Sequence, residues 1–489
     1  MRRNCFLCFC LVLGIGWNAP LLGQEQLGLR LSNFGGINTV FLNPAANGFS
    51  RLSYDINFGE AYGFVETNYG FLRNTSLLDL YRRGDNLSII AAPAITEDNP
   101  ATANDIILDF SENRRDRYLT SSFGVTGPSF MVNLKSGHTF GAFTRARVHG
   151  GAQNIPNILS YYTFDAFPNN TPFTIEQFSG AFASWAELGV NYAYRFQAGT
   201  GTLSLGGNVR FLQGYEAGYF HNERDIEFTK LEDLLSSSNA VQISYGFTNS
   251  QISNDNLSPS ANGTGFGVDL GMVYAVDGYD YDYQFKFGAS ILDIGSIQFN
   301  QNVSNHRLVV NEEVIVDGAA YEFAEGGDDL STITEVFSSQ VLGDSSQSLQ
   351  NGGFRVWLPT ALALQGDYSV TPFFFVNATL IQRLATGGNA LQRGNLLAVT
   401  PRLETRWLEF AMPLSLYNYE ALQLGMAARL GFITIGTEKL GSWFWDANLS
   451  GMDFYVAVKF PPFKFDGSNR KYGRGNRSKR GKRVQCYDF

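Results

Sequence analysis

The residue types best suited to catalysis or metal binding occur in this chain without the spacing that either chemistry needs. The four histidines show no paired spacing, and no HExxH sequence places two of them on one helical face. A GxSxG nucleophile elbow is missing, and the glycines of GTGFGVDLG (Gly263–Gly271) lack the lysine of a phosphate loop. Acidic loop residues could bind calcium but are more often solvated. The residues considered are His138, His149, His221, His306, Asp255, Asp328 and Asp329. We therefore expect no catalytic, metal or cofactor site, and no enzyme.

The charged residues alternate with apolar ones, most clearly from Ala186 to Leu212 (AELGVNYAYRFQAGTGTLSLGGNVRFL). Leu188 and Val190 fall on one face of the first run, and Glu187 falls on the other, which is the period of a β-strand. A glycine-rich break at Ala198–Gly201 separates this run from a second one, so the stretch predicts a β-hairpin. Runs of roughly 9 to 11 residues have the length of a tilted transmembrane strand. We interpret the hairpin as part of an outer-membrane barrel, with its apolar face toward lipid.

The same alternation places many charged residues on the luminal side of the predicted strands. A charge facing lipid costs roughly 2 to 4 kcal/mol at the bilayer midplane for Arg or Lys, so these side chains should point inward. They are Arg145, Arg147, Glu187, Arg195, Arg210, Asp269, Lys286, Asp367, Arg383, Arg402, Glu404, Arg406 and Arg429. We interpret them as a hydrated ion-pair lattice that braces the lumen, and an arginine-lined, anion-selective pore is the alternative. Either interior would be a poor conduit for apolar molecules.

Composition and the N-terminus indicate an exported β-protein. The 52 Gly, 41 Phe and 23 Tyr against 6 Met favour strands, tight turns and aromatic girdles. Arg2 and Arg3 precede the apolar stretch Cys5–Ile15, so residues 1–23 read as a signal peptide. After its removal Cys486 is the remaining cysteine, which excludes an intramolecular disulfide framework. No later run of 18 apolar residues supports a helical membrane protein.

The chain divides into a glycine- and proline-broken segment at 24–50, a β-barrel at 51–460 and a tail at 461–489. Twelve strands can be counted directly, with Leu397–Phe410 and Ala421–Ile435 each taken as one strand. Val241–Phe247 could supply a further pair, which leaves 14 strands open. The polar sections 73–121, 214–262 and 300–353 are expected to be loops, with one short helix at Ser76–Arg83. Long loops and short turns alternate, as expected for extracellular loops and periplasmic turns.

The last predicted strand, Met452–Phe460, carries Phe454 and the terminal Phe460 on one face. It resembles the aromatic-ended closing strand that barrel-assembly machinery recognises. The tail that follows is strongly basic and lacks apolar periodicity, so it should be disordered alone. We interpret it as a periplasmic docking segment for an acidic partner or the cell wall, with a solvated basic end as the alternative. The docking residues are Arg477, Lys479, Arg480, Lys482, Arg483, Tyr487 and Phe489. A nucleic-acid partner does not fit that compartment.

Four stretches together resemble a known group of outer-membrane barrels. They are GGINTVFLNPA (Gly35–Ala45), GPSFMVNL with TRAR (Gly127–Arg147), GVDLGMVY with FGASILDIGSIQF (Gly267–Phe299), and PRLETRWLEFAMPLSLYN with LGMAARLGFITIGTEKL (Pro401–Leu440). The chain is similar to a barrel family related to the PorV and PorP/SprF proteins of type IX secretion and gliding, within the long-chain fatty-acid transporter superfamily. The resemblance implies 14 strands, and it implies that Asn43, Pro44 and Ala45 belong to an N-terminal hatch plugging the lumen.

Transporters and secretion scaffolds share this barrel, so kinship leaves the function open. The fatty-acid branch needs an apolar pocket, whereas the expected lumen is charged. We therefore expect a plugged, monomeric outer-membrane barrel that acts as a scaffold or partner-binding subunit of an envelope complex, in type IX secretion or gliding. Lipid surrounds it, and a protein partner would bind its outer loops or basic tail. The alternative is a transport channel for a small hydrophobic or anionic solute.

Overall fold

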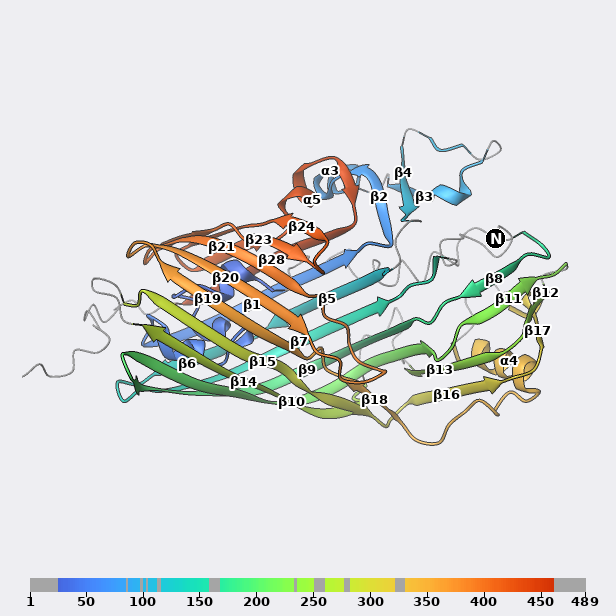
Figure 1. Cartoon of the computed structure of the whole chain (residues 1–489), viewed down its shortest axis with the longest axis horizontal. Helices are drawn as coiled ribbons and strands as arrows, with labels where there is room; N and C mark the ends of the chain where they lie inside the picture. Colours follow the sequence, from blue (N-terminus) through green and yellow to red (C-terminus); the bar gives the residue numbers. More distant parts are fainter. Residues whose placement is uncertain are drawn as a thin grey trace, which may run out of the picture.

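The computed structural model describes residues 25–84, 87–96, 100–102, 104–111, 116–157, 168–232, 235–249, 260–276, 282–321 and 330–460. The expected signal peptide, the basic tail and the loop acids Asp255, Asp328 and Asp329 lie outside these ranges. The described chain forms a closed antiparallel barrel with extra structure at one end (Figure 1). None of its helices is long and apolar enough to cross a membrane.

Fourteen strand positions make up the barrel wall, and the last strand pairs with the first to close it. In order they are β1 (Tyr54–Thr67), β5 (Tyr118–Thr126) with β6 (Ser129–Asn133), β7 (His138–Gln153), β9 (Ser179–Ala198), β10 (Gly201–Asn222), β14 (Gly263–Val276), β15 (Phe285–Phe299), β18 (Phe354–Trp357) with β19 (Ala361–Ser369), β20 (Phe374–Arg383), β21 (Leu396–Glu404), β22 (Leu408–Ala411) with β23 (Leu414–Tyr417), β24 (Ala421–Leu424) with β25 (Met426–Leu430), β26 (Ile433–Thr437) and β28 (Gly451–Phe460).

The prediction of a 14-strand barrel is confirmed, but the two strands missed by direct counting come from an unexpected place. The stretch Leu397–Phe410 contains β21 and the start of the next strand, joined by a turn at 405–407. Ala421–Ile435 likewise holds two wall positions, which a tight turn at Gly431 (φ 59°) separates. The segment Val241–Phe247 is not one of the fourteen, because β13 (Val241–Thr248) pairs with the upper end of β10 and with β16 (Val303–Val310).

The wall has an apolar outer face, which explains why these sequences form membrane-type strands. In the predicted hairpin, β9 and β10 pair around Gly199 (φ 60°), with Leu205 opposite Tyr194. Leu188 and Val190 are about 60% exposed on the outside, whereas Glu187 is buried inside. The hairpin therefore has its apolar face outside and its polar face inside, as the alternation predicted.

Every long connection lies at the end of the barrel opposite the two ends of the wall sequence, Tyr54 and Phe460. We call this end the upper end; it is the extracellular end if the termini are periplasmic. The short turns at 134–137, 199–200, 370–373, 405–407 and 431–432 lie at the lower end. This is the asymmetry of outer-membrane barrels.

Two lobes extend from the upper end, where the sequence predicts loops. The distal lobe holds β13, β16 and a second sheet with helix α4, and its parts are β8 (Pro172–Ile175), β11 (Ile226–Lys230), β12 (Leu235–Ser238), β17 (Val314–Asp317), η8 (Gly318–Tyr321) and α4 (Leu330–Leu342). The lateral lobe consists of β2 (Gly70–Thr75), α3 (Leu77–Arg83), β3 (Ser88–Ala91), η5 (Ala92–Ala94), β4 (Asp105–Phe110), α5 (Leu440–Phe444) and β27 (Ala447–Leu449). Each sheet joins strands from different loops, which local patterns do not reveal. The short helix predicted at Ser76–Arg83 is confirmed as α3, with Ser76 as its N-cap.

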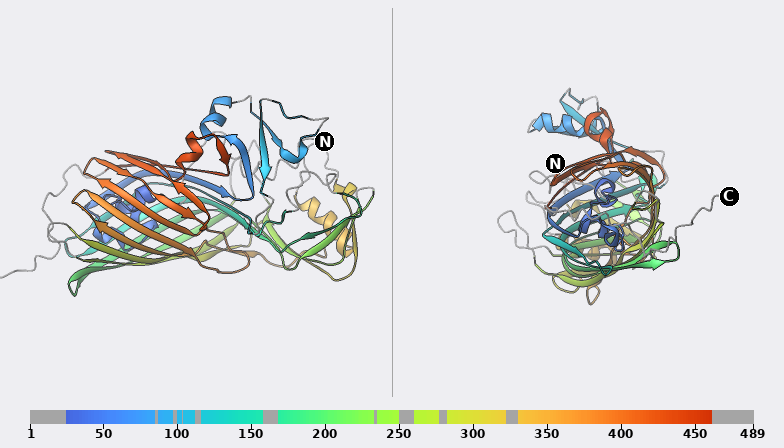
Figure 2. Two further views of the ribbon diagram at one scale, coloured as in Figure 1. Left: turned by 45° about the horizontal axis from the view of Figure 1, so that its top comes forward. Right: turned by 90° about the vertical axis from the view of Figure 1, so that its left-hand side faces the viewer.

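Residues 25–53 lie inside the barrel, and we call them the luminal segment. Figure 2, in the view along the barrel, shows their short helices within the ring of strands. These helices are α2 (Leu27–Arg30), η2 (Gly36–Phe41) and η3 (Ala46–Phe49). Nearly every residue of the segment is buried, so it fills space that would otherwise be an open lumen.

Candidate functional site: a lumen closed by two segments

The luminal segment fits the wall through glycines that leave room for its backbone. Asn43, Pro44 and Ala45 lie against Gly206 of β10 and Gly271 of β14. A Cβ atom at Gly206 would stand 2.6 Å from the Pro44 carbonyl oxygen, and one at Gly271 would stand 2.8 Å from Pro44 Cδ. Real Cβ atoms do not approach other atoms this closely, so the absence of side chains at these two positions makes the contact possible.

Polar side chains of the wall hold the irregular backbone of the segment. Because this backbone forms no ladder, its carbonyl groups need other donors. The donors are Asn208 Nδ2 to Val40 O (3.0 Å), Ser290 Oγ to Leu42 O (2.8 Å), Asn191 Nδ2 to Pro44 O (3.0 Å), Ser204 Oγ to Ala45 O (2.9 Å) and Arg195 Nη1 to Gly48 O (2.7 Å). The sequence alternation that put polar residues inside thus supplies partners for a plug as well as for ion pairs.

A second segment closes the lumen from the upper end. The connection between β20 and β21, residues 384–395, folds inward, and we call it the upper loop. Its Leu391 donates its N–H to the Trp357 carbonyl (2.9 Å), and His149 Nε2 contacts the Gln392 carbonyl at 2.6 Å. Leu391 and Arg393 are buried inside the barrel. Sequence reasoning treated this stretch as an ordinary connection.

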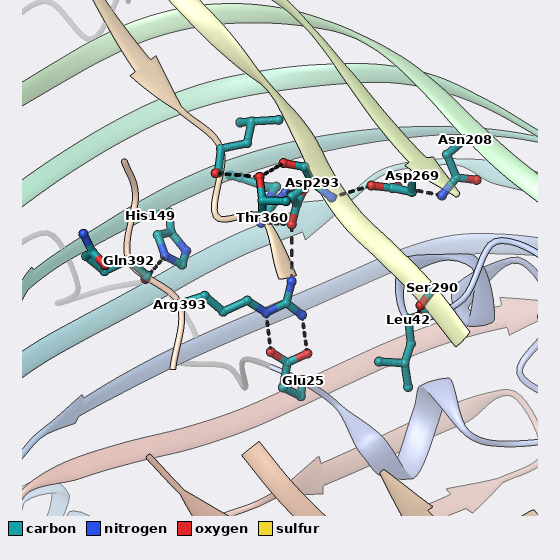
Figure 3. A network of polar contacts seen from close by, with 12 residues as sticks. Glu25, Leu42, His149, Asn208, Asp269, Ser290, Asp293, Thr360, Gln392 and Arg393 are labelled. Carbon is teal, nitrogen blue, oxygen red and sulfur yellow. Dashed lines mark hydrogen bonds and ion pairs between the residues drawn. The ribbon is translucent and has the colours of Figure 1, made fainter. Parts of the chain in front are cut away.

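The two segments meet at one ion-pair junction (Figure 3). Arg393 of the upper loop forms a bidentate pair with Glu25 of the luminal segment, at 2.9 Å and 2.7 Å. Its Nη1 also lies 3.5 Å from Asp293 of β15. Arg147 and Arg210 each approach Asp293 at 2.8 Å, so this carboxylate joins three guanidinium groups. Removing one partner of such a buried pair leaves an uncompensated charge, at a cost of about 3 to 5 kcal/mol.

A local break in β15 brings Asp293 into the lumen. Asp293 has a left-handed backbone (φ 55°), Gly295 follows with φ 151°, and the register with β14 shifts between Val268 and Leu270. The Asp293 N–H donates to Asp269 Oδ1 (2.7 Å), and Thr360 Oγ1 donates to the Asp293 carbonyl (2.8 Å). Bulges of this kind redirect a side chain. Simple alternation could not have assigned Asp293 to the luminal face. The sequence Asp293-Ile294-Gly295 inside an apolar strand was nevertheless a usable sign of a bulge.

Further charge clusters occupy the lower lumen. Arg402 pairs with Asp367 (3.0 Å) and Glu404 (2.8 Å), and Arg429 pairs with Glu409 (3.0 Å). The luminal segment joins both clusters, because Asn33 Nδ2 donates to Glu404 (2.9 Å) and Ser32 Oγ donates to Glu409 (2.7 Å). The ion pairs therefore connect the plug to the wall.

Most residues predicted to be luminal charges lie inside the barrel. They are Arg145, Arg147, Glu187, Arg195, Arg210, Asp269, Lys286, Asp367, Arg402, Glu404 and Arg429. The prediction is wrong for Arg406, which is exposed in the lower turn that was missed at 405–407, and for Arg383, which is exposed at the upper end of β20. The predicted closing strand contains Phe454 and Phe460 on its outer face, where Phe460 packs edge-on against Phe58 of β1 (6.1 Å). Sequence reasoning missed Glu25, Arg30, Asp293, Arg393 and Glu409.

Two apolar clusters line the upper lumen, which sequence reasoning expected to be charged. The first includes Leu27, Phe64, Tyr118, Leu292, Ala361, Ile381, Leu396 and Tyr417. The second includes Trp185, Leu212, Ile297, Phe299, Phe354, Val356, Leu358 and Leu391. The luminal segment contributes Leu27 to the first, and the upper loop contributes Leu391 to the second. The expectation of a uniformly charged interior is therefore wrong for this part of the lumen.

Two cavities inside the barrel are small. One cavity of about 20 Å³ lies among Arg30, Arg145, Asp293 and Arg393, and another of about 40 Å³ lies beside Asn33 and other lower-lumen residues. A buried water needs roughly 10 to 15 Å³ of such space, so each cavity holds one water or a few. Among the residues the structure describes, no three His, Cys, Asp or Glu side chains group as a metal site.

One titratable group of the distal lobe is buried well above the barrel. His306 of β16 stacks on Tyr245 at 5.0 Å between ring centroids, and its Nδ1 lies 3.0 Å from Ser348 Oγ. Burial lowers the pKa of this imidazole from its ordinary value. The lobe therefore holds His306 in its neutral form near pH 7.

Comparison with known proteins gives one family match and several distant structural likenesses. The toluene transporter TbuX of Ralstonia pickettii is 10% identical with a TM-score of 0.40, over 91% of this chain and 99% of that one. A deltaS2 mutant of the TodX monoaromatic hydrocarbon channel is 10% identical (TM-score 0.27; 88% and 95% covered), and the CymD monoaromatic hydrocarbon channel is 8% identical (TM-score 0.23; 92% and 100% covered). No curated protein matches the sequence significantly. Residues 67–438 match a family model, and the chain therefore belongs to the family described as "Family of unknown function (DUF5723)".

Proposed function

We propose that this protein is a gated outer-membrane channel, closed in the state described, for a small and mainly apolar solute. The observation that carries the proposal is the pair of apolar clusters inside the upper lumen, each sealed by a segment that is not part of the wall. A scaffold that only had to stay closed could fill this space with wall side chains. Leu27 and Leu391 instead come from the luminal segment and the upper loop.

The closure is built so that it could be released. The upper loop is held by the pairing of Arg393 with Glu25 and Asp293, by the contact of His149 with Gln392, and by the packing of Leu391. No pairing between two wall strands has to break for this loop to move, because it connects β20 and β21 above their last paired residues. The loop would instead give up its own short bridge to Trp357 at the end of β18. Its outward movement would expose apolar lining, which favours an apolar solute over a hydrophilic one.

Purified protein in planar bilayers and in proteoliposomes tests this proposal. We expect low resting conductance and saturable binding of a small aromatic or aliphatic probe such as toluene. We also expect probe binding to displace the upper loop, which would be measured as faster hydrogen exchange in residues 384–395. Slower hydrogen exchange in residues 384–395 on probe binding would oppose the proposal, as would the lack of any saturable probe binding.

A second candidate is the scaffold function that the sequence analysis expected from a charged, plugged lumen. It is favoured by the distal lobe, in which three separate upper connections build one sheet beyond the membrane-spanning wall (Figure 1). Such a surface suits an envelope protein partner, including one of type IX secretion or gliding. Gentle purification from native membranes should then recover a stoichiometric partner, and its loss on deletion of the distal lobe would support this second candidate over the first.

A further inference from the structure

The lateral lobe overhangs the outer face of the barrel. In Figure 2, seen along the barrel, α3 and α5 lie outside the ring of strands. Trp443 of α5 packs on Phe454, an outward side chain of β28, at 5.7 Å between ring centroids. Its indole Nε1 also donates to the Asp453 carbonyl at 2.9 Å. The helix is therefore fixed against the wall itself, below the upper end of β28.

The overhang replaces lipid on this part of the wall. On the outward face of β1, Ile56 near the lower end is 47% exposed, whereas Val65 near the upper end is 7% exposed. Both side chains point away from the lumen. Val65 follows Phe64, which points inward into the first apolar cluster, and the register shift between Asn57 and Gly59 reverses the alternation for Ile56. The boundary between the lobe and the lipid-facing surface thus runs across β1 and β28.

Large aromatic side chains are exposed on the lobe beside this boundary. Tyr81 of α3 is 84% exposed, Phe444 of α5 is 61% exposed, and Trp445 just after α5 is 58% exposed. The helices α3 and α5 contact each other, and α5 also contacts β24, whose outward Leu422 is 73% exposed. The exposed apolar surface of the lobe is therefore continuous with the lipid-facing surface of the wall.

We propose that the lateral lobe rests on the outer leaflet, with Tyr81, Phe444 and Trp445 inserted into its headgroup region. The lateral lobe projects sideways from the barrel near the upper ends of β1 and β28. At this level the surface beside the barrel is the lipid bilayer, so the lobe lies over lipid. Trp and Tyr prefer this interface because each has an apolar ring and a polar group. A protein partner or a second copy would have to displace lipid from the adjoining wall, whereas lipid already covers it.

Depth-dependent quenching tests the proposal on the whole protein in nanodiscs. In a Cys486→Ser background, Tyr81→Cys and Trp445→Cys would carry a fluorescent label, and the lipid would be phosphatidylethanolamine and phosphatidylglycerol with a headgroup nitroxide. Ile315→Cys is the matched control, because Ile315 is 55% exposed on the distal lobe. We expect several-fold stronger quenching at 81 and 445 than at 315. Equal quenching at all three positions would overturn the proposal.

The other occupants give different results in the same experiment. If a second copy covered the lobe, the labels at 81 and 445 would be shielded only at high protein concentration, in discs holding two copies. If a soluble partner covered it, shielding would depend on adding the native extract. Either result without lipid quenching would contradict insertion into the leaflet. Because single substitutions at exposed positions should not affect folding, heat-modifiable migration on gels serves as the folding control.

Discussion

Arg393→Met should release the upper loop, because the arginine joins both closing segments. The substitution keeps an extended side chain but removes three charged contacts, two to Glu25 and one to Asp293. Asp293 retains Arg147 and Arg210 at 2.8 Å, whereas Glu25 retains only Arg30 at 3.9 Å among its ion pairs in the described chain. The penalty therefore falls mainly on the buried carboxylate of Glu25.

The size of the effect follows from this geometry. Leaving one member of a buried pair uncompensated costs about 3 to 5 kcal/mol, and in the open state Glu25 would be hydrated and would not suffer this cost. Since about 1.4 kcal/mol is a factor of ten, the closed-to-open ratio should fall by roughly two to three and a half orders of magnitude. Glu25→Gln combined with Arg393→Met should restore much of the closure, because no buried charge is then left alone at that contact.

Single-channel recording in planar bilayers measures the open fraction, and hydrogen exchange of residues 384–395 measures loop release independently. Arg383→Met is the matched control, because Arg383 is an exposed arginine at the edge of the same loop and should change neither readout. The reasoning is refuted if Arg393→Met folds normally but keeps wild-type conductance and wild-type exchange. It is also refuted if the double variant is as open as the single one.

Three further predictions concern other parts of the chain. Gly206→Val should lower the free energy of unfolding in detergent by about 1 to 3 kcal/mol, because the new side chain meets the Pro44 carbonyl. Gly366→Ala should be nearly neutral, because no atom lies within 4 Å of the added Cβ. Because burial lowers the pKa of His306, the folded lobe binds fewer protons than the unfolded one. The lobe should therefore be most stable above pH 6.5, the ordinary pKa of histidine, and its stability should fall as the pH drops below this value. The loss should be measurable as faster hydrogen exchange in β16 at low pH, and His306→Gln should remove this pH dependence. Deleting Arg470–Phe489 should leave the barrel folded, as measured by heat-modifiable migration on gels, because the strand that closes the barrel ends at Phe460. The same deletion should weaken partner binding. Loss of heat-modifiable migration would show that the tail is part of the barrel.

The sequence by itself determined the barrel, the outward face of its strands and most of its luminal charges. Alternation with period two is a local property, so Glu187, Arg210 and Asp367 could be assigned to the inside without knowing their partners. The same rule failed where the period breaks. The tight turn at 405–407 hid a strand boundary and misplaced Arg406, and the bulge in β15 hid Asp293.

Only the tertiary structure decided which contacts close the lumen and how the upper loops assemble into lobes. The junction joins Arg393 to Asp293, 100 residues away in sequence, and to Glu25, 368 residues away, and no spacing rule connects them. The apolar upper lumen depends on Leu391 folding inward from a connection whose local sequence predicts only a loop. Contacts between distant segments depend on how the wall curves and closes, and this geometry is set by all fourteen strands together.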